Sequence, residues 1–292
     1  MGRKMQNVTL LGTGLMGAPM ARNIAAAGFD LTVWNRSAGK AAPLADDGIA
    51  VAGSPAAAAR NADVVISMVS DGSIVSELVQ EADLRAALKP RAIWIDMSST
   101  KPDEARDVAA SLAALNVNFL DAPVSGGPEG AKAGTLAIMV GGNGAVFEQA
   151  RAVLSCMGRA TRVGPPGAGQ LAKLANQAIV GVAIAAVAEA TLMLEQGGAD
   201  VAAVRAALKG GFADSAILQV HGARMSARDF TPGGPARLQL KDLDNVLTEA
   251  GALQMPVITH VRDRFARYVA DLGGADKDHA GLFEELLDLN GT

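Results

Sequence analysis

Three polar side chains lie within the most apolar helix that the sequence predicts, at 168–196. Lys173 is three residues before Asn176 and four before Gln177. Side chains at these separations are neighbours on one helix face. A lysine ammonium can stabilise developing negative charge and donate a proton, and amides can orient it. The alternative is a lysine that extends its amine to solvent beside two amides.

Two further segments contain groups suited to binding an anion. The segment Asp121-Ala-Pro-Val-Ser-Gly-Gly ends a predicted strand with the hydroxyl of Ser125 and the backbone N–H groups of Gly126 and Gly127. Exposed N–H groups beside a serine can form a pocket for a carboxylate, although such a segment can also be an ordinary turn. Lys241 begins the segment Lys-Asp-Leu-Asp-Asn, for which a solvated helix start is the alternative.

A glycine-rich loop near the start of the chain predicts a dinucleotide site. It consists of Gly12, Thr13, Gly14, Leu15, Met16 and Gly17, between a predicted strand and a predicted helix. In this GxGxxG pattern the first glycine permits a tight turn, the second admits a pyrophosphate, and the third lets helix and strand pack closely. The helix N-terminus supplies free N–H groups and the positive end of a dipole. A glycine-rich turn without a ligand is the alternative.

The end of the second predicted strand indicates which dinucleotide binds. It carries Asn35, Arg36 and Ser37 in place of the acidic residue that binds the ribose hydroxyls of NAD. Arg36 can pair with a 2′-phosphate and stack on adenine, while Asn35 and Ser37 can add hydrogen bonds. We therefore favour NADP as the cofactor, with NAD possible. The alternative is that Arg36 is an exposed loop arginine that contacts no cofactor. Met68 and Val69, at the end of the third strand, are also candidate cofactor contacts.

These residues require a particular order of elements. Short apolar runs at 8–11, 31–34, 64–68, 93–96, 119–121 and 137–140 alternate with helical stretches such as 19–27 and 102–115. Alternation of this kind predicts an α/β fold with a doubly wound parallel sheet of Rossmann type. After the breaker cluster at 164–167, only helices are expected, at 168–196, 201–208, 238–250, 256–272 and 279–289. We place a cofactor domain at 1–165 and an all-helical substrate and dimerisation domain at 166–292.

Composition excludes several classes of function. Half of the 292 residues are hydrophobic, 19% are charged, and the net charge is -4, so neither disorder nor nucleic-acid binding is expected. The apolar run 179–188 is about half the length of a membrane span. One cysteine, Cys156, permits no internal disulfide and suits a reducing cytoplasm. His221, His260 and His279 lack metal-ligand spacing, so no metal is expected and no candidate ligands are expected to converge.

The Ala-rich helix also bears on assembly. Most of it is expected to be buried core, but its apolar face is longer than a small second domain can cover. We therefore expect a second copy to pack on it, forming a homodimer or homotetramer.

Together these segments resemble the β-hydroxyacid dehydrogenase family, which includes 3-hydroxyisobutyrate dehydrogenases and tartronate semialdehyde reductases. The resemblance runs nearly end to end, through GTGLMGAPMARN at 12–23, DAPVSGGPEGAKAGTL at 121–136, GAGQLAKLANQ at 167–177 and KDLDN at 241–245. The segment 210–215 and Gln177, where many relatives have a second asparagine, look most like the tartronate semialdehyde reductases. Ser99 stands where relatives usually carry a cofactor-contacting threonine, and it keeps the hydroxyl.

The resemblance implies a role for each candidate. Lys173 would be the catalytic acid/base, and Ser125, Gly126 and Gly127 would hold the substrate carboxylate. Asn176 and Gln177 would orient Lys173 and the substrate, and Lys241 would close the site near the nicotinamide. The implied reaction is the reversible reduction of a small carboxylate-bearing aldehyde by NAD(P)H, in a site between the two domains that closes on binding.

Other substrates and another class of function stay open. Within the family, the alternatives are 3-hydroxyisobutyrate, succinic semialdehyde, glyoxylate and methylmalonate semialdehyde, and side chains near 212–215 and Phe230 would set substrate length. Imine reductases share the fold but typically lack the lysine. A non-catalytic dinucleotide-binding module is the alternative of another class, and Lys173 together with the Ser-Gly-Gly segment argues against it.

Overall fold

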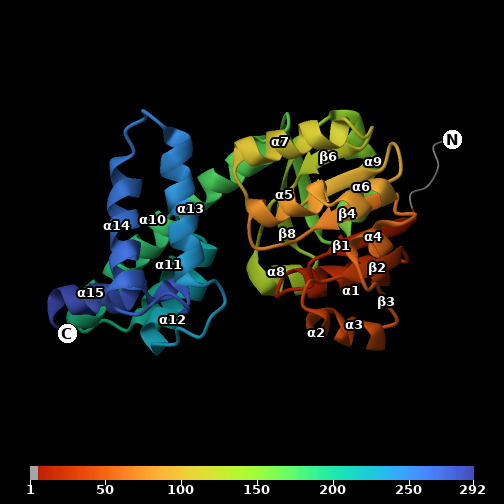
Figure 1. Ribbon diagram of the computed structural model, residues 1–292. Helices are drawn as coiled ribbons and strands as arrows, with labels where there is room; N and C mark the ends of the chain where they lie inside the picture. Colours follow the sequence, from red (N-terminus) through yellow and green to blue (C-terminus); the bar gives the residue numbers. More distant parts are fainter. Residues whose placement is uncertain (1–5) are drawn as a thin grey trace. The chain divides into compact units, whose positions relative to one another are not determined.

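The structure is a computed structural model that describes residues 6–292 (Figure 1). The chain forms two compact units, one ending at Lys173 and one beginning at Leu174. Each unit is described by itself below.

The first unit is built on a sheet whose first six strands are parallel. Their spatial order is β3-β2-β1-β4-β5-β6, which is the strand order of a Rossmann fold. The strands are β1 (Asn7–Leu11), β2 (Asp30–Trp34), β3 (Ala50–Val51), β4 (Val64–Ser67), β5 (Ile93–Asp96) and β6 (Asn118–Asp121). The predicted α/β doubly wound sheet is confirmed.

Beyond β6 the sheet becomes mixed. Strand β8 (Leu136–Gly142) runs antiparallel to β6 and to the two-residue strand β7 (Val124–Ser125), and β9 (Gly158–Gly164) runs parallel to β8. Of these three strands, the sequence predicted only the middle of β8. Strand β9 lies at the edge of the sheet, and each of its side chains is exposed or only partly buried. It therefore lacks the apolar run by which a buried strand is predicted.

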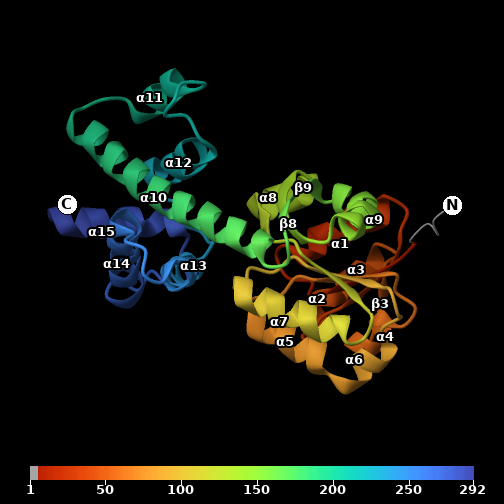
Figure 2. The same cartoon turned by 90° about the horizontal axis from the view of Figure 1, so that it is seen from above.

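Helices cover both faces of this sheet (Figure 2). One face packs on α1 (Gly17–Ala26), α3 (Pro43–Asp46) and α9 (Gly144–Ser155), and the other on the four helices from α4 to α7. The remaining bounds are α2 (Ala38–Ala41), α4 (Pro55–Ala59), α5 (Gly72–Gln80), α6 (Ala82–Ala87), α7 (Pro102–Ala113) and α8 (Gly127–Ala133). N-cap side chains stabilise the first turns of several of these helices. At the start of α5, for example, the Asp71 carboxylate accepts the N–H groups of Ser73 and Ile74.

The second unit is helical, as predicted for the C-terminal domain. Its bounds are α10 (Ala168–Gln196, which begins in the first unit), α11 (Val201–Leu208), a π-helical segment (Ile217–His221), α12 (Gly222–Ala227), α13 (Ala236–Ala250), α14 (Pro256–Ala270), a 3₁₀ turn (His279–Gly281) and α15 (Leu282–Asn290). Its core joins α10, α12, α13, α14 and α15 around fully buried Phe265, Tyr268 and Phe283.

Helix α10 is long and apolar enough to cross a membrane by length and composition. Its 29 residues exceed the apolar run 179–188, which is about half the length of a membrane span. Ile184, Ala185 and Ala188 of this helix are buried in the core of the second unit. Because these three residues pack against other helices of the second unit, we interpret α10 as a core helix.

Candidate active site

The glycine loop at the carboxyl end of β1 has the geometry that each of its glycines was expected to provide. Gly12 has a φ of 105°, and a Cβ there would lie 2.2 Å from the carbonyl oxygen of Met68. A Cβ on Gly17 would lie 2.0 Å from the carbonyl oxygen of Gly12. A Cβ on Gly14 would meet nothing within 4 Å. The outer glycines are therefore required by the protein's own backbone, whereas the middle one leaves space for a ligand.

Asn35 holds this loop against the end of β2. Its Oδ1 accepts the N–H of Thr13 at 2.9 Å, and its Nδ2 donates to the carbonyl of Ser37. The Thr13 hydroxyl is buried and, among residues 6–292, has no hydrogen-bond partner. A buried hydroxyl without a partner, next to open space at Gly14, fits a dinucleotide phosphate in this loop.

The other candidate cofactor residues follow the same edge of the sheet. Arg36 and Ser37 are exposed just beyond β2. Met68 and Val69 follow β4, where the Met68 N–H donates to Leu11 and the Val69 N–H donates to the Ser98 hydroxyl. Ser99 follows β5 and is partly buried. Carboxyl ends of adjacent parallel strands are where nucleotides bind in such sheets.

A buried carboxylate underlies this edge. Asp96, the last residue of β5, accepts hydrogen bonds from the Ser67 hydroxyl and the Ser98 N–H, and Trp94 donates its indole N–H to Ser67. Burial raises the pKa of Asp96 to about 6, against the lowering effect of these hydrogen bonds.

The Ser-Gly-Gly segment lies at the junction of β7 and α8. Ser125 ends β7 and is partly buried, whereas Gly126 and Gly127 are exposed with φ values of 137° and 63°. A Cβ on Gly126 would approach Leu136 at 3.1 Å, while one on Gly127 would meet nothing within 4 Å. The segment is thus an open turn that needs glycine at both positions.

The first turn of α10 is held on the ends of β5 and β6. The Asp121 carboxylate accepts the N–H groups of Gly167 and Gln170, both at 2.9 Å. The Gln170 amide accepts the Thr100 N–H at 3.0 Å and donates to the Ser98 carbonyl at 2.9 Å. Lys173 is three residues further along the same helix and partly buried. The sequence pointed to this helix and to the Asp121 segment, but not to the contact between Asp121 and the start of the helix or to Gln170.

In the second unit, Asn176 and Gln177 join a partly buried network of amides and a carboxylate. Gln177 Nε2 donates to Asp242 Oδ2 at 2.8 Å and to Gln239 Oε1 at 3.3 Å, and its Oε1 accepts Asn176 Nδ2 at 2.9 Å. Gln239 returns a bond to the Gln177 carbonyl at 3.0 Å. Lys241 lies 3.4 Å from the Asp242 carboxylate. Three predicted site residues, Asn176, Gln177 and Lys241, are therefore connected through Asp242.

Two of the three histidines also converge, contrary to the expectation that no candidate ligands would. His221, Asp278 and His279 have possible ligand atoms within 4.8 Å of one another. Asp278 already accepts the N–H groups of Gly233, Gly234 and Ala280, and Arg224 pairs with it at 2.7 Å. Since a guanidinium already neutralises this carboxylate, we interpret the cluster as a support for the 230–235 loop rather than a metal centre.

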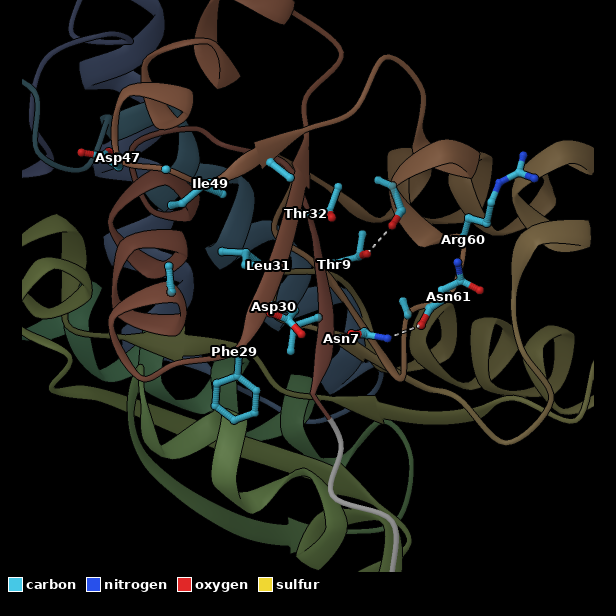
Figure 3. A pocket seen from close by; sticks show the side chains of 16 residues that line it. Asn7, Thr9, Phe29, Asp30, Leu31, Thr32, Asp47, Ile49, Arg60 and Asn61 are labelled. Carbon is cyan, nitrogen blue, oxygen red and sulfur yellow. Dashed lines mark hydrogen bonds between the residues drawn. The ribbon is translucent and has the colours of Figure 1, made fainter.

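A cavity of about 620 Å³ lies elsewhere on the first unit (Figure 3). Asn7 and Asp30, the first residues of β1 and β2, line it together with Thr9, Arg60 and Asn61. These are the amino ends of the strands, whereas the glycine loop follows the carboxyl end of β1. The cavity therefore does not belong to the candidate site.

Known families match both parts of the chain. Residues 7–164 match the NAD binding domain of 6-phosphogluconate dehydrogenase, and residues 167–286 match the domain described as NAD-binding of NADP-dependent 3-hydroxyisobutyrate dehydrogenase. The chain is 41% identical over 285 residues to 2-hydroxy-3-oxopropionate reductase of Escherichia coli (strain K12), covering 94% of this chain and 95% of that protein. The chain belongs to the 3-hydroxyisobutyrate dehydrogenase-like family of β-hydroxyacid dehydrogenases. The predicted family is confirmed, and the chain is an NAD(P)-dependent oxidoreductase.

Further proteins are similar to the chain over nearly its whole length. The 3-hydroxyisobutyrate dehydrogenase of Pseudomonas aeruginosa is 35% identical, over 95% of this chain and 96% of that protein. The structure of Mycobacterium tuberculosis 3-hydroxyisobutyrate dehydrogenase with L-serine has a TM-score of 0.86 and 33% identity, covering 97% of this chain and 99% of that one. Psf3 in complex with NADP+ and 2-OPP has a TM-score of 0.87 and 25% identity, covering 96% and 99%.

Proposed function

We propose that the chain reduces 2-hydroxy-3-oxopropionate (tartronate semialdehyde) to glycerate, reversibly, with NADPH as the preferred reductant. The observation that carries the proposal is the 41% identity to the Escherichia coli reductase over nearly the whole of both chains. The 3-hydroxyisobutyrate dehydrogenases of Pseudomonas aeruginosa and Mycobacterium tuberculosis share 35% and 33%.

Lys173 is the proton donor in this proposal. A nicotinamide dinucleotide bound at the glycine loop would supply the hydride to the aldehyde carbon. The carbonyl oxygen then gains negative charge, which an ammonium group stabilises before it transfers a proton to that oxygen. Partial burial of Lys173 supports this role, since an ammonium group with less water around it interacts more strongly with developing negative charge.

The substrate carboxylate is assigned to Ser125, Gly126 and Gly127. Support comes from the exposure of both glycines and from the open space at Gly127. N–H groups and a hydroxyl of this kind bind a carboxylate through charge-assisted hydrogen bonds. The same set explains why a small acid, and not a neutral aldehyde, would be preferred.

Asn176 and Gln177 are assigned linked roles in orienting Lys173 and the substrate. Gln177 bridges α10 to α13 through Asp242 and Gln239, and it accepts a hydrogen bond from the Asn176 amide. We therefore assign to Gln177 the fixing of the Asn176 amide, through which it acts on substrate binding. Lys241, paired with Asp242, is assigned to the nicotinamide end of the cofactor.

The preference for NADP rests on the end of β2. No carboxylate occupies positions 35–37, and Arg36 is exposed there. The structural relative Psf3 was solved with NADP+. Both observations support a 2′-phosphate contact by Arg36 with help from Asn35 and Ser37.

We also propose a division of labour and an assembly. Residues 1–165 bind the cofactor, and residues 166–292 bind the substrate and form a homodimer or homotetramer, in a cytoplasmic enzyme. The support for assembly is the exposed apolar surface of α10, where Leu171, Ile179 and Met193 are 51%, 70% and 68% exposed. Light scattering on the purified protein tests it, and a monomer at micromolar concentration would contradict it.

A substrate panel tests the proposed reaction. NADPH oxidation is followed with 2-hydroxy-3-oxopropionate, glyoxylate, succinic semialdehyde and methylmalonate semialdehyde, and the reverse reaction with glycerate and 3-hydroxyisobutyrate. The expected result is a kcat/KM for 2-hydroxy-3-oxopropionate at least tenfold above that of every other aldehyde. A higher value for another acid would overturn the proposed substrate while leaving the reaction class intact.

A further inference from the structure

A buried polar cluster joins the start of α10 to the carboxyl ends of β5 and β6. It consists of Asp121 and Gln170 with the backbone of Ser98, Thr100 and Gly167, and we call it the helix-docking cluster. Asp121 and Gln170 are both 0% exposed. Neither is a candidate ligand of cofactor or substrate, so their burial calls for another explanation.

Asp121 acts as an N-cap supplied from a distant part of the chain. The N-cap position of α10 is Gly167, which has no side chain to accept the free N–H groups of the first turn. Asp121 instead accepts the N–H groups of Gly167 and Gln170, one on each carboxylate oxygen. A carboxylate at this position also interacts favourably with the helix dipole. The start of α10 is thereby fixed to the last residue of β6.

The packing around Asp121 leaves little freedom of position. A Cβ on Gly169 would lie 2.5 Å from the carbonyl oxygens of both Asp121 and Met139, and a Cβ on Gly141 would lie 2.3 Å from Asp121 Oδ1. Only glycine at 169 and 141 lets the helix approach the strands so closely. The segment Gly-Ala-Gly-Gln at 167–170 is therefore a docking sequence for the helix that bears Lys173.

Gln170 connects this helix to the turn that contains Ser99. Its Oε1 accepts the Thr100 N–H and its Nε2 donates to the Ser98 carbonyl, so one amide spans both sides of Ser99. Ser99 is a candidate cofactor contact. Lys173 lies three residues beyond Gln170 in α10, so the two side chains are neighbours on one face of the helix. The Gln170 side chain thus fixes the position of the turn at Ser98–Thr100 relative to the helix that carries Lys173.

We propose that Asp121 and Gln170 are positioning residues that hold the Lys173 amine in register with the bound cofactor. This inference rests on the proposed role of Lys173. A misplacement of about 1 Å in reacting groups can lower a rate about a hundredfold, so loss of the cluster is expected to act mainly on the chemical step.

Two variants test the proposal. Asp121→Asn keeps the side-chain shape but opposes an amide NH₂ to one backbone N–H, and Gln170→Met keeps the volume but removes both hydrogen bonds. For each we expect kcat to fall about 10- to 100-fold, KM for the aldehyde to change less than about threefold, and the cofactor to bind still. Leu84→Val, in a buried position on α6, is a matched control for destabilisation, with kcat expected to stay within about twofold.

The pH profile and a double-mutant cycle separate positioning from a purely structural effect. The limb of the kcat/KM profile that disappears in Lys173→Ala is expected to shift in Gln170→Met, and Gln170→Met is expected to cost no further activity in the Lys173→Ala background. An unchanged limb with wild-type kcat, or full additivity with Lys173→Ala, would overturn the positioning role. If Asp121→Asn fails to fold, Gln170→Met decides.

Failure of the proposed function has a different signature. Near-normal turnover in Lys173→Ala would remove the lysine's role and this inference with it. Loss of turnover in Lys173→Ala, together with normal turnover and an unchanged pH limb in Gln170→Met, would contradict this inference alone.

Discussion

Replacement of Arg36 by alanine is expected to weaken NADPH binding far more than NADH binding. Arg36 is exposed just beyond β2, where a dinucleotide bound at Gly12–Gly17 would place its adenosine end. The 2′-phosphate is the one group that distinguishes the two cofactors. The variant therefore removes a charge-assisted contact from NADPH and leaves NADH nearly unchanged.

The magnitude follows from the exposure of Arg36. A hydrogen bond to a charged group contributes about 1.5–3 kcal/mol, which corresponds to about 10- to 150-fold in affinity. Solvent screening of an exposed side chain favours the lower part of this range, so we expect the Kd of NADPH to rise about 10- to 30-fold. The Kd of NADH should change less than about threefold, and the effect on NADPH should shrink in high salt.

Fluorescence titration of both cofactors measures these values directly. Arg36→Lys is expected to give an intermediate affinity, because it keeps the charge but not the planar fork. Arg60→Ala, an exposed arginine at the opposite edge of the sheet (Figure 3), is the matched control and should leave both cofactors unaffected. Equal losses for NADPH and NADH in Arg36→Ala would refute the 2′-phosphate contact.

Three further predictions concern stability and the glycine loop. The pKa of Asp96 is raised from 3.8 to about 6, so the native state binds more protons than the unfolded state between these pH values. The contribution of Asp96 to the unfolding free energy therefore falls by up to about 3 kcal/mol as pH rises through this window. Asp96→Asn should flatten this pH dependence in denaturant titrations, and an unchanged slope would contradict the prediction. The pKa of Asp278 is lowered, against the effect of burial, by His221, His279 and backbone N–H groups, so the contribution of Asp278 to the unfolding free energy is present above pH 3.8 and lost as pH falls below it. Asp278→Ala should lower the unfolding free energy by about 3 kcal/mol at neutral pH, near the lower limit for a buried pair because Arg224 is partly exposed. A loss under 1 kcal/mol would show that the cluster is dispensable. Gly14→Ala should unfold at the wild-type temperature yet bind NADPH at least tenfold more weakly, and normal binding would argue against a phosphate at this loop.

The sequence predicted the part of the fold that depends on local patterns. The apolar runs of the parallel strands β4 and β5 continue without interruption up to the polar last residue, and those of β1 and β2 are interrupted only by Thr9 and Thr32. Such runs are expected where both sheet faces are covered, and the glycine loop follows β1 directly. Strands β3 and β7 have two residues each and leave no periodic signal. The π-helical segment at Ile217–His221 continues into α12 and likewise carries no distinguishing pattern.

Contacts between distant residues were the part of the site that the sequence did not reveal. Short helical spacing is the sequence signal for a pair of histidine ligands, whereas His221 meets Asp278 and His279 from a separate element. In the sequence, Asp121 is only the start of the Ser-Gly-Gly segment, although its position at the end of β6 makes it available to cap another element. Its partner Gln170 is polar within an apolar helix, and that mismatch was the available signal.

In the proposed reaction, Lys173 supplies the proton to the substrate. This role is measured by single-turnover oxidation of enzyme-bound NADPH by 2-hydroxy-3-oxopropionate in Lys173→Ala and in wild type, with Lys89→Ala at the amino end of the sheet as the control lysine. We predict that Lys173→Ala folds, binds NADPH with wild-type affinity and loses at least about a thousandfold in rate, while Lys89→Ala keeps its rate. A Lys173→Ala rate within tenfold of wild type would contradict this role.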